Sequence, residues 1–457
     1  MNVVKCGMNC LGVMALMVLT MIAKGAAAEE KNAPQTVTPN VRVLDLKPVW
    51  SGHPTRFALL TEKGRQFVAF YDANRQMTLA QRNVDDDVWT FKALDTFIVW
   101  DSHNAVTIAL DRQGILHVSG NMHCVPLIYF KGSKPFDIQS VERVAGMTGE
   151  REKQVTYPVF LKGINGELIF NYRDGKSGNG ATFYNVYDEE NQSWKRLIEG
   201  PIFDGLGKMN AYPQAPKKGP DGWFHMTWVW RNTPMAETNH DLSYARSRDL
   251  IHWEAGDGQP LKLPITLQSP GAIVDPIPVK GGIINGSGKA GFDLQGNVVI
   301  AYHKFDEKGN TQLYFARLEK GKWKSYLATK WDYRWDFSGP GTLAGGISHS
   351  FLEPENGKLK ISLSHLKYGG GTFEVNPETF ELMGKVDSNA HAALPAKLGK
   401  VVSTFPEMKV NWMTDAGDVS PNVEYRVRWE TLGPNRDLAR PKPWPEPTML
   451  QVVEIRR

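Results

Sequence analysis

Two short polar clusters hold residues that could form an acid–base site. The first is Trp100-Asp101-Ser102-His103-Asn104 and the second is Asn121-Met122-His123. Residues 105–120 between them read as two strands joined by a turn, which predicts a β-hairpin. Residues of such a hairpin pair when their numbers sum to about 226, so His103 and His123 should meet at the end away from the turn. Two neighbouring imidazoles can accept and donate protons near neutral pH.

A second hairpin is predicted directly downstream, and it adds a phenol and a guanidinium. Strand-like segments 157–160 and 168–173 flank the turn Gly163-Ile164-Asn165-Gly166. Folding about that turn places Tyr157 opposite Arg173. Arginine presents a rigid fork of donors that suits a carboxylate or a sulfate. The two hairpins together therefore predict an acid–base site beside an anion-binding group.

The same register argument brings further polar side chains to equivalent strand ends, including a pairing of His349 with His365. Taken singly, each histidine is better explained as a hydrogen-bonded structural residue, and each tyrosine before a proline as packing between sheets. Their recurrence favours a site for an anionic ligand and supports an enzyme more weakly. The candidate substrate-binding residues are Asn104, Tyr212, Arg231, Asn239, His240, His303 and His349.

Several common catalytic motifs are absent from the sequence. It contains no Gly-x-Ser-x-Gly elbow, phosphate loop, His-Glu-x-x-His motif or dinucleotide fingerprint. No pair of carboxylates stands out for ordinary glycoside hydrolysis. An enzyme acting on carbohydrate would therefore use histidine and tyrosine as its acid and base.

Repeated turn-and-strand units predict the fold. Helix signals are almost absent, and glycines at 64, 114, 166, 222, 296 and 357 each precede a β-branched or aromatic run. Six such units and a strand-rich C-terminal stretch predict an all-β, seven-bladed β-propeller whose blades are four-stranded antiparallel sheets. Segments 41–46 and 449–455 should pair in the last blade and remove a free edge. A pair of β-sandwiches is the structural alternative.

Composition and targeting signals limit the possible binding partners, the cellular location and the domain organisation. The 457 residues are 41% hydrophobic and 22% charged with a net charge of +4, which gives no reason to expect nucleic-acid binding. Residues 1–28 read as a signal peptide, so we expect export to the periplasm or the extracellular space without a membrane span. We expect a flexible segment at 29–40 and a single catalytic propeller domain, acting as a monomer, at 41–457. After export Cys124 would be the single cysteine, which excludes an internal disulfide and favours a buried thiol over a metal ligand.

The chain resembles the BNR-repeat propeller family that contains ulvan lyases, L-rhamnose-α-1,4-D-glucuronate lyases and related α-L-rhamnosidases. The resemblance covers nearly the whole chain after the signal peptide and implies a seven-bladed propeller. It also implies an anionic, uronic-acid polysaccharide from green algae or plant gums as the partner. The segments that carry it are Val49-Trp50-Ser51-Gly52-His53-Pro54, Trp100-Asp101-Ser102-His103-Asn104, Ser119-Gly120-Asn121-Met122-His123, Thr156-Tyr157-Pro158, Tyr172-Arg173-Asp174-Gly175 and Asn239-His240-Asp241-Leu242-Ser243-Tyr244.

The resemblance implies a polysaccharide lyase acting by β-elimination. Such an enzyme removes the C5 proton of the uronate and expels the rhamnose-linked O4. His103, His123 and Tyr157 would supply the base and the acid, Arg173 would neutralise the carboxylate, and Asn104 would help to hold it. Which residue is the base stays open at this point. Catalysis would require no cofactor, and relatives carry a structural calcium or zinc ion.

Two other functions stay open on the sequence. The rhamnosidase branch implies hydrolysis of the same linkage on a different surface of the propeller, with His53 as the suspected residue. A propeller lectin would bind uronates without turnover, and it would need Arg173 but no base. The choice between ulvan and gum or arabinogalactan, and between endo and exo action, stays open as well.

Overall fold

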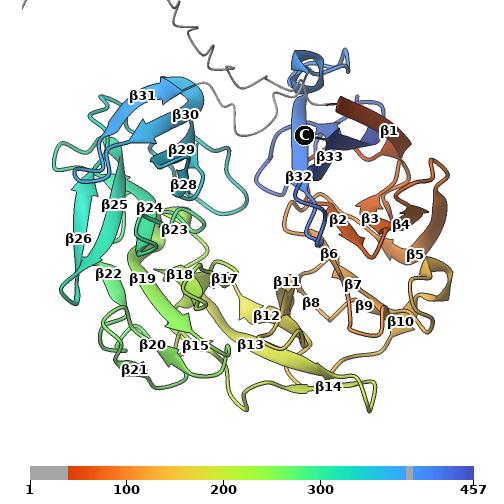
Figure 1. The fold of residues 1–457 in the computed structure, drawn as a ribbon, viewed down its shortest axis with the longest axis horizontal. Helices are drawn as coiled ribbons and strands as arrows, with labels where there is room; N and C mark the ends of the chain where they lie inside the picture. Colours follow the sequence, from red (N-terminus) through yellow and green to blue (C-terminus); the bar gives the residue numbers. More distant parts are fainter. Residues whose placement is uncertain (1–39, 387–394, 457) are drawn as a thin grey trace, which may run out of the picture. The chain divides into compact units, whose positions relative to one another are not determined.

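Short β-branched and aromatic runs form antiparallel strands throughout the computed structural model, which describes residues 40–386 and 395–456. Figure 1 shows their sheets arranged around a common centre. The expected signal peptide at 1–28 lies outside the described residues, as does nearly all of the expected flexible segment at 29–40.

Six sheets are each built from neighbouring strands of the sequence. The first contains β2 (Ala58–Glu62), β3 (Arg65–Tyr71), β4 (Gln76–Asn83) and β5 (Thr90–Phe97). The second contains β6 (Val106–Leu110), β7 (Leu116–Gly120), β9 (Tyr129–Lys131) and β10 (Glu142–Val144). The third contains β8 (His123–Val125), β11 (Val155–Lys162), β12 (Leu168–Lys176), β13 (Asn179–Asp188), β14 (Ser193–Arg196) and β15 (Phe203–Asp204).

The remaining three of these sheets follow in chain order. The fourth contains β16 (Asn210–Pro213), β17 (Lys217–Lys218), β18 (Phe224–Arg231), β19 (Asn239–Ser247), β20 (Trp253–Glu254), β21 (Pro260–Leu261) and β22 (Ile273–Asp275). The fifth contains β23 (Lys289–Phe292), β24 (Val298–Phe305), β25 (Thr311–Glu319) and β26 (Lys322–Leu327). The sixth contains β27 (Ile347–His349), β28 (Glu353–Glu355), β29 (Lys358–His365), β30 (Gly369–Val375) and β31 (Leu382–Val386).

A composite sheet joins both ends of the described chain. Its strand order is β1 (Asn40–Val49), β34 (Thr448–Arg456), β33 (Val423–Thr431) and β32 (Lys409–Thr414). Val43 pairs with Val453, so the predicted pairing of the first and last strands is confirmed. This pairing satisfies one edge of β34 that would otherwise be free.

The predicted all-β propeller of four-stranded antiparallel sheets is confirmed, because each sheet contains a run of at least four hydrogen-bonded strands. Consecutive segments build six blades, where the prediction counted seven, and the remaining sheet is the composite of both ends. In residues 40–386 and 395–456 the helical segments are 3-10 turns: η1 (Ile138–Ser140), η2 (Ala236–Thr238) and η3 (Ala396–Gly399). Among the described residues, no helix has the length and apolar character needed to cross a membrane.

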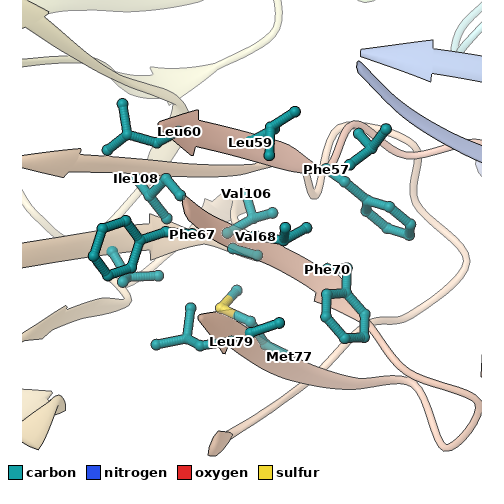
Figure 2. Close-up of a cluster of buried hydrophobic side chains, with 14 of the residues drawn as sticks. Phe57, Leu59, Leu60, Phe67, Val68, Phe70, Met77, Leu79, Val106 and Ile108 are labelled. Carbon is teal, nitrogen blue, oxygen red and sulfur yellow. The ribbon is translucent and has the colours of Figure 1, made fainter. Parts of the chain in front are cut away.

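The core lies between neighbouring sheets. Nearly every residue of β3 is buried, and its apolar side chains belong to a cluster that also contains residues of the composite sheet and of the second sheet. Figure 2 shows Phe67 and Val68 of β3 together with Val106 and Ile108 of β6 in this cluster of buried side chains. A strand buried on both faces reads as a continuous apolar run rather than an alternating one.

The hairpin before the site has the predicted register. Val106 pairs with Gly120 and Leu110 with Leu116. The turn between them uses Gly114 at φ 83°, and a Cβ there would lie 2.5 Å from the ring of Phe136. Glycine is therefore required at this turn both for its backbone conformation and for lack of space.

The second hairpin departs from the predicted register. Thr156, not Tyr157, pairs with Arg173, and the next pair is Val159 with Asn171. A bulge between them contains Pro158, which has no N–H for the ladder, and Tyr157, whose φ is 57°. The prediction that Tyr157 lies directly opposite Arg173 is wrong by one residue, and the bulge redirects the tyrosine side chain.

Candidate active site

Three adjacent strands bring the central residues together. After Gly120 the chain leaves the second sheet, and β8 joins the edge of β11 in the third sheet. Thr156 of β11 pairs with His123 of β8 on one side and with Arg173 of β12 on the other. Tyr157 follows Thr156, so histidine, tyrosine and arginine lie side by side at one end of this sheet.

A carboxylate links the two histidines. Asp101 Oδ1 lies 2.7 Å from Nδ1 of His103, and Asp101 Oδ2 lies 2.6 Å from Nδ1 of His123. The imidazole rings stack with their centroids 4.1 Å apart. Each Nδ1–H donates to the carboxylate, which fixes the tautomer and leaves both Nε2 atoms for other partners.

The carboxylate of Asp101 also affects the protonation of the neighbouring histidine pair. Burial would raise the pKa of Asp101, but hydrogen bonds from His103 and His123 outweigh it and hold that pKa far below its usual range. Burial would lower the pKa of His123, but hydrogen bonds to Asp101 and Cys124 outweigh it and raise the pKa to about 9. His123 is therefore an imidazolium at neutral pH. His103 lines the larger cavity whereas His123 lines neither cavity, so His103 is the ring better placed to meet a ligand.

Tyr157 lies between the histidines and the arginine. Its ring centroid is 5.7 Å from that of His103 and 5.0 Å from Cζ of Arg173. Burial raises the pKa of the Tyr157 phenol, and the opposing effect of Arg173 is smaller. The phenol therefore stays protonated at neutral pH and is suited to act as an acid.

Hydrogen bonds hold the guanidinium of Arg173 in place. Arg173 is 3% exposed, and its Nη2 donates to Thr156 Oγ1 at 3.0 Å. Nη1 donates to the Tyr212 hydroxyl at 3.4 Å, and Nη2 also reaches Cys124 Sγ at 3.4 Å. Burial would raise the pKa of Cys124, but the neighbouring His123 and Arg173 lower it to about 7. The cysteine expected to be buried is half-buried and lies against the arginine.

Two adjoining cavities open beside these residues. The larger has a volume of about 390 Å³ and is lined by His103, Tyr157, Arg231 and residues of the fifth and sixth sheets. The smaller has a volume of about 270 Å³ and includes Arg173 and Tyr212 in its lining. The two cavities share four residues, which are Arg56, Tyr157, Asn285 and Gly286. A ligand longer than one sugar ring can therefore extend across Tyr157 from one cavity into the other.

The other predicted site residues fall into two groups. Arg231, His303 and His349 line the larger cavity and Tyr212 lines the smaller one. A second group lines neither cavity and makes protein contacts instead: Asn104, whose carbonyl accepts from Tyr71; Asn239, which donates to the Ala236 carbonyl; His240, which lies between Asp241 and Asn232; and His365, which packs on Trp331, Tyr333 and Tyr368.

His53, the candidate for a hydrolase, lies in an aromatic cluster. It is 2% exposed, and its Nδ1 accepts a hydrogen bond from Trp50 Nε1 at 3.0 Å. Its ring also packs against Trp100. Burial, the largest effect, lowers the pKa of His53 to about 4. His53 lines neither of the two cavities.

Sequence reasoning missed several residues of the site. Asp101 was inside a recognised cluster, and its spacing of two from His103 was a usable signal for a linking carboxylate. Lys289 lines the larger cavity, and its spacing of two from Ser287 places the two residues on the same side of an extended segment. Arg56 and Trp335 lie in connecting segments, where no strand register predicts their position.

The same cluster has the composition of a metal site. One ligand atom from each of Asp101, His103 and His123 lies within 4.8 Å of the others. However, both carboxylate oxygens already accept hydrogen bonds from the two Nδ1 atoms. An ion at this position would have to replace those hydrogen bonds, so the geometry favours a hydrogen-bonded acid–base group.

Comparisons with known proteins agree with this architecture. The short isoform of an ulvan lyase from Alteromonas sp. (strain LOR) is 38% identical over 63 residues, which are 14% of this chain and only 12% of that relative. The crystal structure of the polysaccharide lyase Uly1 has a TM-score of 0.61 at 13% identity, covering 92% of this chain and 100% of that chain. A PL25 ulvan lyase bound to -[GlcA(1-4)Rha3S]- has a TM-score of 0.60 at 13% identity, covering 89% and 95%. At these identities the solved structures show a shared fold. The family described as "BNR repeat-containing family member" matches residues 65–331, and the chain belongs to this family.

Proposed function

We propose that this protein is a polysaccharide lyase that cleaves the L-rhamnose-α-1,4-D-glucuronate linkage of an ulvan-type or gum-type polysaccharide by β-elimination. The observation that carries the proposal is the row formed by His103, Tyr157 and Arg173, with Tyr157 lining both cavities. The ulvan lyase relative and the two solved lyase structures support the same class of reaction.

Each group has a defined role in the proposed reaction. The uronate carboxylate binds near Arg173, whose charge, with that of His123, stabilises the negative charge that develops after loss of the C5 proton. His103 accepts that proton through Nε2. The electron pair forms the C4–C5 double bond, the C4–O4 bond breaks, and the Tyr157 hydroxyl donates its proton to the departing O4. Asp101 holds both imidazoles in orientation throughout.

Two alternatives fit the geometry less well. Hydrolysis through His53 requires access for the sugar and for water, and His53 is 2% exposed among tryptophans. A lectin would need a group such as Arg173, but it would have no use for a histidine pair oriented by a carboxylate beside a phenol. We also propose that residues 1–28 direct export, because an enzyme must be outside the cytoplasm to bind an extracellular polysaccharide.

Purified protein incubated with ulvan and with gum arabic tests the proposal. Elimination leaves an unsaturated uronate that absorbs ultraviolet light, whereas hydrolysis and binding leave none. We expect an absorbance increase with at least one polymer. An increase in reducing ends without absorbance would indicate a hydrolase, and binding without either signal would indicate a lectin.

A further inference from the structure

We propose that the larger cavity contains a second anion-binding site, formed by Ser287, Lys289 and His303, which holds a sulfate ester or carboxylate on the sugar next to the uronate. This inference rests on the proposed function for the identity of the uronate. The site is separate from Arg173, which lines the smaller cavity.

The charge of the cavity lining is the first argument. Arg56, Arg231 and Lys289 line the larger cavity, and its lining contains no aspartate or glutamate. Lys289 makes no ion pair within the described residues, and its ammonium donates to the backbone carbonyl of His349. One uronate carboxylate beside Arg173 would leave this positive charge unmatched. A second anionic group on the ligand would match it.

Unpartnered polar groups are the second, independent argument. Ser287 is 4% exposed and His303 is 3% exposed, and both line the cavity. Within the described residues, neither ring nitrogen of His303 nor the hydroxyl of Ser287 has a hydrogen-bond partner. Buried polar groups in native proteins are nearly always paired, so this wall has the donors that a bound ligand would satisfy.

The remaining lining fits a sugar ring. Burial lowers the pKa of His303 to about 3, so the ring is neutral and offers one N–H donor and one acceptor. Trp335 lies with its ring centroid 5.6 Å from that of His303 and supplies an aromatic surface. A cation, hydrogen-bonding groups and an aromatic ring together suit a substituted pyranose with one negative charge.

Calorimetric binding measurements test this site without turnover. They use the His103→Ala protein with a sulfated uronate–rhamnose oligosaccharide, its chemically desulfated form, and a non-sulfated oligosaccharide with a carboxylate on the neighbouring sugar. Lys289→Met should weaken binding of the two ligands that carry a second anionic group about 10- to 100-fold, and should leave binding of the desulfated ligand, which keeps only its uronate carboxylate, nearly unchanged. Comparison of the sulfated and carboxylated ligands identifies which anion the site accepts.

Two further variants complete the experiment. Ser287→Ala should weaken the same ligand about 2- to 10-fold without lowering the melting temperature, because the hydroxyl has no protein partner to lose. Lys131→Met is the matched control: Lys131 is a partly buried lysine that donates to the Tyr187 hydroxyl and lines neither cavity. It should bind every ligand like the parent protein.

The outcomes separate this inference from the proposed function. If the wild-type protein produces no unsaturated uronate but binding still depends on Lys289 and on the second anion, the lyase assignment fails and the anion site stands. If Lys289→Met and Ser287→Ala bind the ligands that carry a second anionic group as tightly as Lys131→Met does, the anion site is refuted even when elimination is observed.

Discussion

At the scale of single residues, Asp101 is the group on which the site depends. It accepts a hydrogen bond from each of His103 and His123, and it thereby orients two rings whose positions come from different segments. The sequence indicated both histidines, and the spacing of two suggested a contact between Asp101 and His103, but that spacing could not show that the same carboxylate also reaches His123. The unpaired state of Ser287 and His303 likewise arises from three-dimensional packing and has no signature in the sequence.

Substitution of Asp101 tests its electrostatic role directly. In Asp101→Asn, the pKa of His123 should fall from about 9 towards its ordinary value, because the neutral amide no longer stabilises the imidazolium. Histidine proton resonances followed by NMR across pH 5–10 (about the range where His123 titrates) measure this change. Asp95→Asn, an exposed change on β5, should leave the titration unaltered. An unchanged His123 titration in Asp101→Asn would refute the shared-carboxylate account.

The same pair makes stability depend on pH with a defined sign. Because the folded pKa of His123 is raised, its contribution is fully present below its ordinary value of 6.5 and is lost as pH rises through about 9. Because the folded pKa of Asp101 is depressed, its contribution is present above its ordinary value of 3.8 and is lost on acidification. The difference in unfolding free energy between wild type and Asp101→Asn should therefore shrink by on the order of 2 kcal/mol between pH 6.5 and pH 9. Denaturant titrations at several pH values would measure it, and a difference that grows with pH would contradict this explanation.

At the scale of elements, glycine turns and a bulge determine which side chains reach the site. The register of the first hairpin could be predicted because its turn residues specify it, and Val106 does pair with Gly120. The second could not be predicted to the residue, since a bulge at Pro158 adds a position that strand alternation does not show. The transfer of β8 to the third sheet was also not predictable, because His123 and Cys124 continue the first hairpin in sequence while pairing with β11 in space.

A pair of glycine substitutions tests the turn argument. Gly64 and Gly114 have similar φ angles of 72° and 83°, but a Cβ at Gly64 meets nothing within 4 Å whereas one at Gly114 lies 2.5 Å from Phe136. Gly64→Ala should cost about 1–2 kcal/mol of unfolding free energy from the left-handed backbone alone. Gly114→Ala should cost a further ~1–3 kcal/mol from the steric clash. Chemical denaturation measures both losses of unfolding free energy. Equal losses for the two variants would show that the turn before β7 relaxes around the added methyl group, which would contradict the steric argument.

At the scale of the whole molecule, the repeated turn-and-strand units identified the architecture, and the two ends of the described chain meet in one sheet. The count of blades built from consecutive segments was less predictable, because short strands such as β8, β15 and β17 join sheets irregularly. Pairing of β1 with β34 connects residues about 400 positions apart and is the long-range contact that the sequence pattern did predict.

A reversible crosslink tests the importance of that pairing. Val43 and Val453 are paired residues of β1 and β34, and cysteines at both positions should form a disulfide when oxidised. The free energy of unfolding of the oxidised protein should be about 2–4 kcal/mol higher than that of the same protein after reduction. Reduction of the wild type, whose described residues contain Cys124 as a free cysteine, serves as the control. Failure of the disulfide to form in the folded protein would contradict the register of the composite sheet.

The ultraviolet absorbance of the reaction product tests the central claim most directly. Wild-type protein acting on ulvan or gum arabic should generate an unsaturated uronate, and His103→Ala, Tyr157→Phe and Arg173→Ala should each reduce the rate about 10²- to 10⁴-fold while remaining folded. His252→Ala, which changes an imidazole that is 86% exposed, should retain the full rate. Wild-type rates of absorbance increase in the three site variants would contradict the account.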